Sequence, residues 1–289
     1  MTVILDAPTS VLEGSVMVTR VQLAPGERAV VRSGEVTLTR TIAYRYRQEA
    51  ADGGTHLATA RRTEVVARQA LPAASGDREG VGYDVEALLP VPAQGPPSAD
   101  TELVSVDWAV RVRLDVGAAW PAQAVAKVAV LTSGAAFDGT VARPPHTDDR
   151  GHTVVAIDRL STRRIAPGMS LRGDVVVAPL HPGPIRSVRL ELVLLEHVPS
   201  GAAHPPDAVG RKDTATVVAV VELVSSIQVG DDLQALRLPF VLDVPDPLRA
   251  PSMVTPEFEL CWALRAVVSR PLHRDAYAEL DLQAVTVSG

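Results

Sequence analysis

The sequence is poor in several features that would point to particular classes of protein. A single cysteine, Cys261, among 289 residues excludes an intrachain disulfide and a cysteine-based zinc site. Aromatic residues make up only 3% of the chain, so Val, Leu, Ala and Ile must fill most of any core. No apolar run approaches the ~18 residues that span a bilayer, and the N-terminus lacks the basic and apolar regions of a secretory signal. We therefore expect a cytoplasmic protein without a transmembrane segment.

Positive charge is also scarce. The chain has 28 Lys and Arg against 34 Asp and Glu, for a net charge of −6, whereas nucleic-acid-binding proteins usually have a basic excess. Catalytic signatures are missing too, because there is no Gly-x-Ser-x-Gly elbow, P-loop, dinucleotide fingerprint or His-Glu-x-x-His. We predict a protein that is not an enzyme, takes no cofactor and does not bind nucleic acid.

What the sequence does contain is an internal repeat. Ser98 and Trp108 recur as Ser252 and Trp262, an offset of 154 in both cases, and each Trp begins a Trp-Ala-x-Arg segment. A repeat of this length indicates two copies of one domain. We predict domains at 1–132 and 158–289, joined by a linker at 133–157 where Gly and Pro interrupt the strand pattern.

The hydrophobic pattern indicates strands. Apolar residues alternate with polar or small ones from Val104 to Leu114 and again from Phe258 to Ala266, which is the period of a half-buried strand. Helical periodicity is nearly absent, and turn residues separate several short strands in each half. The prediction is an all-β chain of two tandem immunoglobulin-like antiparallel sandwiches. Trp108 and Trp262 are expected between the two sheets of their sandwiches.

Segments upstream of the tryptophans also match between the halves. Gly34-Glu35-Val36 is matched with Gly173-Asp174-Val175 as the opening of a strand. Ile42 to Tyr46 is matched with Val188 to Leu192 as the following strand.

This order of motifs resembles an arrestin-like domain over nearly the whole chain. The second half fits best, with Pro167-Gly168, Gly173-Asp174-Val175, Leu238-Pro239-Phe240 and Pro251-Ser252 ahead of Trp262. The first half fits more loosely, from Pro25-Gly26-Glu27 to Trp108. The resemblance implies two sandwiches that act as an adaptor or scaffold, in a family that includes bacterial sporulation-control proteins. The sequence has no Pro-Pro-x-Tyr, so ubiquitin-ligase recruitment of the α-arrestin type is not expected.

Arginines of the first half are the main binding candidate. Arg45 and Arg47 lie two apart on a predicted strand and share a face opposite Tyr44 and Tyr46. Further arginines come from adjoining segments, namely Arg40, Arg61, Arg62 and Arg68. Guanidinium groups match phosphate and carboxylate oxygens, and the arrestin resemblance would make this a phosphopeptide surface. The alternative is a solvated sheet face, whose surface charge needs no functional explanation.

The loop from Pro199 to Lys212, with His204 and Arg211, is the second candidate contact for a partner. An insertion without a role is the alternative. His146 and His152 flank Asp148 and Asp149, and His197 and His204 bracket this loop. Zinc needs three or four rigidly held ligands, so we predict no metal site. Cys261 is expected on the outer face of its strand as an unreactive thiol.

The function predicted from the sequence is a non-enzymatic adaptor. It would bind other proteins through strand edges, loops or the arginine-rich face. A lipid- or carbohydrate-binding sandwich is the alternative, and it predicts a pocket lined by exposed aromatic residues. An enzyme with a dispersed site would require a buried cluster of His or carboxylate side chains with shifted pKa values.

Overall fold

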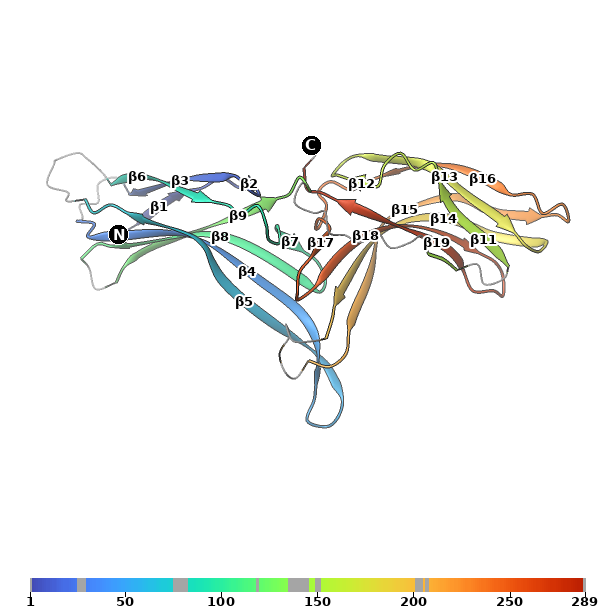
Figure 1. The fold of residues 1–289 in the computed structure, drawn as a ribbon, viewed down its shortest axis with the longest axis horizontal. Coiled ribbons are helices and arrows are strands. Elements are labelled where there is room, and N and C mark those ends of the chain that lie inside the picture. The colour runs from blue at the N-terminus through green and yellow to red at the C-terminus, as the bar shows by residue number, and fades with distance from the viewer. Residues whose placement is uncertain are drawn as a thin grey trace. The chain divides into compact units, whose positions relative to one another are not determined.

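Each half of the chain folds into two packed β-sheets in this computed structural model (Figure 1). The structure describes residues 2–24, 30–74, 83–117, 120–134, 146–148 (backbone only), 152–200, 205 and 208–287. Strands joined by turns make up these residues, and none of them lies in a helix. The chain divides into two compact units, Met1–Ala136 and Phe137–Gly289. The all-β fold of two tandem β-sandwiches predicted from the sequence is confirmed.

The first unit contains a small and a large sheet. Its described strands are β1 (Val3–Asp6), β2 (Ser10–Leu12), β3 (Val16–Leu23), β4 (Ser33–Glu49), β5 (Thr55–Leu71), β6 (Asp84–Pro90), β7 (Ala99–Asp100), β8 (Val104–Asp115) and β9 (Ala122–Leu131). The small sheet has the order β1-β3-β6. The large sheet has the order β2-β9-β8-β4-β5, with β7 beside β8.

The second unit repeats this arrangement. Its described strands are β10 (His146–Asp148), β11 (Thr153–Asp158), β12 (Arg164–Ile165), β13 (Ser170–Pro179), β14 (Gly183–Val198), β15 (Lys212–Val229), β16 (Leu236–Asp243), β17 (Met253–Val254), β18 (Glu259–Ser269) and β19 (Ala276–Ala284). The small sheet is β11-β13-β16, and the large sheet is β10-β19-β18-β14-β15 with β12 and β17 attached. Each strand from β1 to β9 therefore has a counterpart whose number is higher by ten, so that β1 corresponds to β11 and β9 to β19. Among the described strands, β10 has no counterpart in the first unit.

The repeat extends to single hydrogen bonds of the tryptophans. The indole N–H of Trp108 donates to the carbonyl oxygen of Pro96 over 3.3 Å. The indole N–H of Trp262 donates to the carbonyl oxygen of Ala250 over 3.0 Å. Both side chains are buried, at 3% and 0% exposure. Trp262 belongs to a core cluster drawn from both sheets of its unit. A buried indole usually has a hydrogen-bond partner for its N–H. Each half supplies this partner from the equivalent loop.

A repeated serine holds the last strand of each large sheet. The Ser98 hydroxyl accepts a hydrogen bond from the backbone N–H of Val130, and the Ser252 hydroxyl accepts one from Ala284, both over 2.9 Å. The backbone N–H of each serine donates to the carbonyl oxygen of the same residue. The constant spacing from Ser to Trp in the sequence thus reflects two contacts present in both sandwiches, the hydrogen bonds of the serine and the hydrogen bond of the indole.

Neither predicted match between the halves aligns equivalent residues. Ile42 to Tyr46 and Val188 to Leu192 lie on the counterpart strands β4 and β14, but the residue equivalent to Val188 is Gly34. The other match joins different sheets. Gly34 lies on β4 in the large sheet, whereas Gly173 lies on β13 in the small sheet. The glycine that repeats with Gly168 is Gly14, 154 positions earlier, and the two have φ of 72° and 73°. Both occupy the turn before the central strand of the small sheet, where a positive φ favours glycine. Pro25-Gly26-Glu27 lies outside the described residues.

The second unit begins earlier than the sequence predicted. β10, and β11 except for Asp158, lie within 133–157, the range predicted as a linker, but β10 pairs with β19 and β11 pairs with β13. Gly and Pro near these short strands obscure the period-two pattern that would have revealed them.

The halves fill the same space in the small sheets with different residues. Thr19 faces Ala87 in the first unit, and Gly173 faces Phe240 at the equivalent position of the second. A Cβ atom on Gly173 would lie 2.9 Å from the Phe240 ring. A larger side chain on one strand is therefore compensated by a smaller one on its neighbour.

Both large sheets contain a β-bulge at the same place. The pairing of β4 with β5 shifts between Leu38 and Thr39, and that of β14 with β15 shifts between Leu192 and Val193. The extra residues are Val66 and Val218, each on the strand at the edge of its sheet. A bulge that recurs at equivalent positions is a designed part of the fold.

Candidate functional site

A two-stranded arm positions the arginines that the sequence singles out. β4 pairs with β8 only from Ser33 to Tyr44, but it pairs with β5 as far as Glu49, so the hairpin extends beyond β8 (Figure 1). Period two places the side chains of Arg45 and Arg47 on the outer face of this arm, and both are exposed. Tyr44 and Tyr46 alternate with them on the inner face and are buried.

Arg61 joins the two arginines on the outer face, but Arg62 does not. Arg61 lies opposite Ala43 on β4, so it is a diagonal neighbour of Arg45. Arg62 lies opposite the buried Ile42 and points to the other side of the arm. Adjacent residues of a strand face opposite ways, so Arg61 and Arg62 cannot share one surface. Among the described residues, Arg45, Arg47 and Arg61 form no ion pair.

Arg40 is not part of this surface, contrary to the sequence interpretation. Its side chain is 13% exposed, forms an ion pair with Glu64, and lies 5.2 Å from the centre of the Trp108 ring. Arg40 lies opposite Trp108 in the sheet and so faces the interior of the sandwich. Its Nη1 atom is buried without a hydrogen-bond partner in the described structure. Arg40 is therefore a core residue of the first unit.

The large sheet of the first unit brings further charges to the same outer face. The sequence interpretation included Arg68, which lies 3.5 Å from Glu35, but missed Arg111, Arg113 and Lys127 on β8 and β9. The carboxylates on this face are those of Glu35, Glu49, Asp100, Asp107 and Asp115. Seven cations against five carboxylates make this face basic in a chain whose net charge is −6. The alternation around Trp108 marked Arg111 and Arg113 as outward, but not that β8 neighbours β4.

Arg211, the candidate from the second unit, is tied into a cluster at the tip of the β14–β15 hairpin. Its guanidinium forms an ion pair with Asp213, whose Oδ1 lies 2.9 Å from Nδ1 of His197. Burial raises the pKa of the Asp213 carboxyl, but hydrogen bonds and electrostatic attraction from Arg211 and His197 together lower it by more. The cluster balances its own charges, which favours a structural role for Arg211. His204 lies outside the described residues.

Three histidines gather at one end of the second unit. The ring centres of His152 and His273 are 4.1 Å apart, and those of His152 and His181 are 6.1 Å apart. Desolvation and the neighbouring His273, His181 and Arg270 lower the pKa of His152. The guanidinium of Arg270 donates to the carbonyl oxygens of His152 and His181, among others, and so fixes their loops.

Metal and thiol chemistry find little support in the described part of the chain. No group of three or more His, Cys, Asp or Glu side chains there is arranged to hold a metal ion. The side chains of His146, Asp148 and Asp149 fall outside the description. Cys261 is buried with its thiol 2.9 Å from Oε1 of Glu259, and a neighbouring carboxylate disfavours the reactive thiolate.

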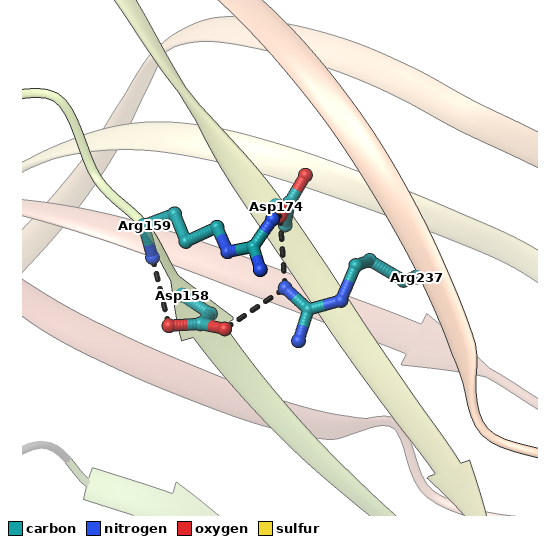
Figure 2. A network of polar contacts seen from close by, with 4 residues as sticks. All are labelled: Asp158, Arg159, Asp174 and Arg237. Atoms are coloured by element: carbon teal, nitrogen blue, oxygen red, sulfur yellow. Dashed lines mark hydrogen bonds and ion pairs between the residues drawn. The ribbon is translucent and has the colours of Figure 1, made fainter.

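Paired charges cross the small sheet of the second unit. Nη1 of Arg237 on β16 lies 2.8 Å from a carboxylate oxygen of Asp158 on β11 and 2.8 Å from one of Asp174 on β13. Figure 2 shows Arg237 between these two aspartates. The hydrogen bond from Arg237 is the main cause that lowers the pKa of the Asp158 carboxyl, and the backbone N–H of Arg159 adds to it. The guanidinium of Arg159 lies 3.8 Å from the same Asp174 carboxylate. Both aspartates are thus paired with arginine, and the network clamps three strands together.

The first unit has the same clamp with two charges exchanged. Arg20 on β3 occupies the position of Asp174, and Asp84 on β6 occupies that of Arg237. Arg20 and Asp84 form an ion pair, and the hydrogen bond from Arg20 is the main cause that lowers the pKa of Asp84 to about 2. Asp6 lies opposite Arg20 as Asp158 lies opposite Asp174.

Exchanging the charges in the second unit tests this equivalence. Arg237→Asp places three carboxylates together, so we expect the melting temperature to fall. Adding Asp174→Arg recreates the arrangement of Asp6, Arg20 and Asp84 and is expected to recover most of the loss. Thermal unfolding followed by circular dichroism measures both changes. A double variant no more stable than Arg237→Asp would show that the two clamps are not equivalent.

Comparison with known proteins adds no functional assignment. The chain matches no protein-family model, and no curated protein is similar to it in sequence. In the described residues, no helix is long and apolar enough to cross a membrane.

Proposed function

We propose that the protein is a non-enzymatic adaptor, with an arrestin-like pair of sandwiches, that binds an acidic protein surface through the outer face of the β4–β5 arm. The observation that supports this most directly is the group Arg45, Arg47 and Arg61, three exposed cations that form no ion pair within the described structure. Unpaired guanidinium groups bind carboxylates and phosphates with little rearrangement.

The arm supplies a rigid support for these groups. Sixteen cross-strand residue pairs join β4 to β5, and five of them, from Arg45 with Thr59 to Glu49 with Thr55, lie beyond β8. Strands position side chains more accurately than loops do. Leu57, opposite Arg47, is 49% exposed, so the surface also offers an apolar contact. A combination of Arg with an exposed apolar side chain is typical of protein interfaces.

The ligand-binding alternative has weaker support. A lipid or carbohydrate pocket would need exposed aromatic side chains, but Tyr44, Tyr46, Trp108 and Trp262 are buried. Among the described tryptophans only Trp120, at 83% exposure, is open to solvent. It lies in the turn between β8 and β9.

The test uses neutralisation of the three arginines with a matched control. The variant Arg45→Gln/Arg47→Gln/Arg61→Gln and the control Arg186→Gln/Arg249→Gln/Arg274→Gln lose the same charge from exposed positions. Each protein is used as bait in extract of its own cells. A stoichiometric protein captured by the wild type and the control, but at least tenfold less by the first variant, would support the proposal. Equal capture by all three, or co-purification of a small molecule alone, would contradict it.

A further inference from the structure

The outer edge of β5 carries backbone groups that no described strand pairs. β5 is the last strand of its sheet, with β4 on one side and no described strand on the other. The backbone N–H of Arg45 donates to the carbonyl oxygen of Leu103 over 2.8 Å, so the backbone groups of Arg45 point toward β8 and away from β5. Its cross-strand partner Thr59 therefore directs its own N–H and carbonyl oxygen away from β4, toward the free edge.

The same alternation identifies the other residues that face the free edge. Every second residue of β5 directs its backbone groups the same way and its side chain to the same face. These residues, all exposed and all on the outer face of the arm, are Thr55, Leu57, Thr59, Arg61 and Thr63. Outside the ladder with β4, none of them takes part in a backbone hydrogen bond with another described residue. A segment bound at this edge would therefore also lie beside the arginines of the outer face.

The second unit lacks these features at the equivalent place. β14 extends only one residue, Val198, beyond its pairing with β18, so the second unit has no arm. Asp213 occupies the position of Arg61, and it already forms an ion pair with Arg211. The sandwich therefore folds without an extended edge and without unpaired cations at this position. Binding is the reason we assign to both in the first unit.

We propose that an extended segment of the partner, with acidic side chains at alternate positions, adds as an antiparallel strand to the free edge of β5. This inference rests on the proposed function and specifies how the arm binds its partner. A row of backbone donors and acceptors at strand spacing is complemented by another strand, because an extended backbone repeats the same groups at the same spacing. A helix has no free backbone groups along its length. The antiparallel direction is favoured because its ladder is the more stable of the two.

The charges of the arm favour an acidic segment. A residue of the added strand opposite Arg61 would have its side chain on the outer face, with the two Cβ atoms about 5 Å apart. Residues opposite Thr59 and Leu57 would lie two strands, about 10 Å, from Arg45 and Arg47, a gap that a glutamate and an arginine side chain span together. Acidic residues at every second position would thus each face one arginine. Antiparallel pairing with a second copy of β5 would instead gather the three arginines of each copy on one face, which disfavours it.

A synthetic peptide tests the strand addition. The probe is a dye-labelled peptide in which Glu and Thr alternate, long enough to pair with residues 55–63. A matched peptide carries methyl groups on the backbone nitrogens of its glutamates, which keeps every charge but removes the donors to the carbonyl oxygens of β5. Fluorescence anisotropy with the full chain measures both dissociation constants. We expect the probe to bind, and the methylated peptide to bind at least about tenfold more weakly because several hydrogen bonds are lost.

Two substitutions of one residue give the matched test on the protein. Thr59→Pro removes the N–H that faces the free edge but no hydrogen bond to β4, and proline is tolerated on an edge strand in this orientation. Thr59→Val keeps the N–H. We expect Thr59→Pro to weaken binding of the probe at least about fivefold and Thr59→Val to stay within about twofold of the wild type. Circular dichroism checks the folding of both variants, and if Thr59→Pro does not fold, the methylated peptide alone decides.

The outcomes separate this inference from the proposed function. Strand addition is overturned if the wild type does not bind the probe, or if it binds the methylated peptide equally well. Equal binding of the probe by folded Thr59→Pro, or by the variant Arg45→Gln/Arg47→Gln/Arg61→Gln, overturns it as well. If that triple variant loses the partner in cell extract while Thr59→Pro retains it, the arm binds through side chains alone, and the proposed function stands without the added strand.

Discussion

Trp262→Ala is expected to lower the free energy of unfolding by about 3–5 kcal/mol. The indole is fully buried in the core of the second unit, and alanine leaves a cavity that strands on both sides cannot close. The substitution also removes the donor for the carbonyl oxygen of Ala250, which leaves a polar group without its partner. Urea denaturation followed by circular dichroism measures the loss without relying on tryptophan fluorescence.

Two further variants make this measurement specific. Trp108→Ala removes the equivalent indole of the first unit, at 3% exposure, and is expected to have an effect of similar size. Trp120→Ala removes a side chain that is 83% exposed, so stability should change by no more than about 0.5 kcal/mol. Similar small effects for all three tryptophans would refute the assignment of Trp108 and Trp262 to the two cores.

Glu64→Ala is expected to have the second largest effect and to lower the free energy of unfolding by about 2 kcal/mol. Removing one partner of a buried ion pair leaves the other charge uncompensated, which costs about 3–5 kcal/mol when both groups are deeply buried. Arg40 is 13% exposed, but Glu64 is 37% exposed, so water reaching the pair should reduce that cost. The measurement is again urea denaturation.

The double variant Arg40→Leu/Glu64→Thr should recover this loss or exceed it. Leu194 and Thr216 occupy these two positions in the second unit, opposite Trp262 and on the edge strand. The same sandwich thus exists with an apolar residue in place of the arginine, and such replacements of buried ion pairs are neutral or stabilising. If the double variant were no more stable than Glu64→Ala, the second unit would not be a valid guide to the first.

The long side chain of Arg40 also explains a local difference between the loops. A Cβ atom at Gly95 would lie 2.2 Å from Nη1 of Arg40, and Gly95 has φ of 140°. The second unit has the shorter Leu194 in place of Arg40, and the residue equivalent to Gly95 is Arg249, one before Ala250. Glycine at position 95 therefore leaves room for the Arg40 guanidinium, which any larger residue there would displace.

The elements that the sequence predicts well are those with strong local signals. Period two around Trp108 and Trp262, with the constant spacing from Ser98 and Ser252, correctly predicts two all-β halves. The match of Gly34 with Gly173 failed because a Gly-x-Val segment fits the start of many strands. Only strand order shows that Gly173 belongs to the small sheet.

The candidate surface could be predicted only in part for a similar reason. Alternation alone places Arg45 and Arg47 together and separates Arg61 from Arg62. It does not show that Arg40 lies opposite Glu64 in the sheet and forms an ion pair with it, which allows the arginine to be largely buried. Arg111 and Lys127 join the face through pairing between strands far apart in the sequence, which local patterns do not reveal.

The bulges in the edge strands bear on the tendency of the protein to aggregate. β15 is rich in valine and has no proline, so an uninterrupted ladder along it would be a template for cross-β growth. Its two register shifts leave Lys212–Val217 as the regular stretch nearest the hairpin tip, only six residue pairs long. β5 has one shift and a regular stretch of eleven pairs from Thr55 to Val65, but that stretch includes Arg61, Arg62 and Glu64. The two halves thus limit the same hazard by different means, one through backbone irregularity and the other through charge.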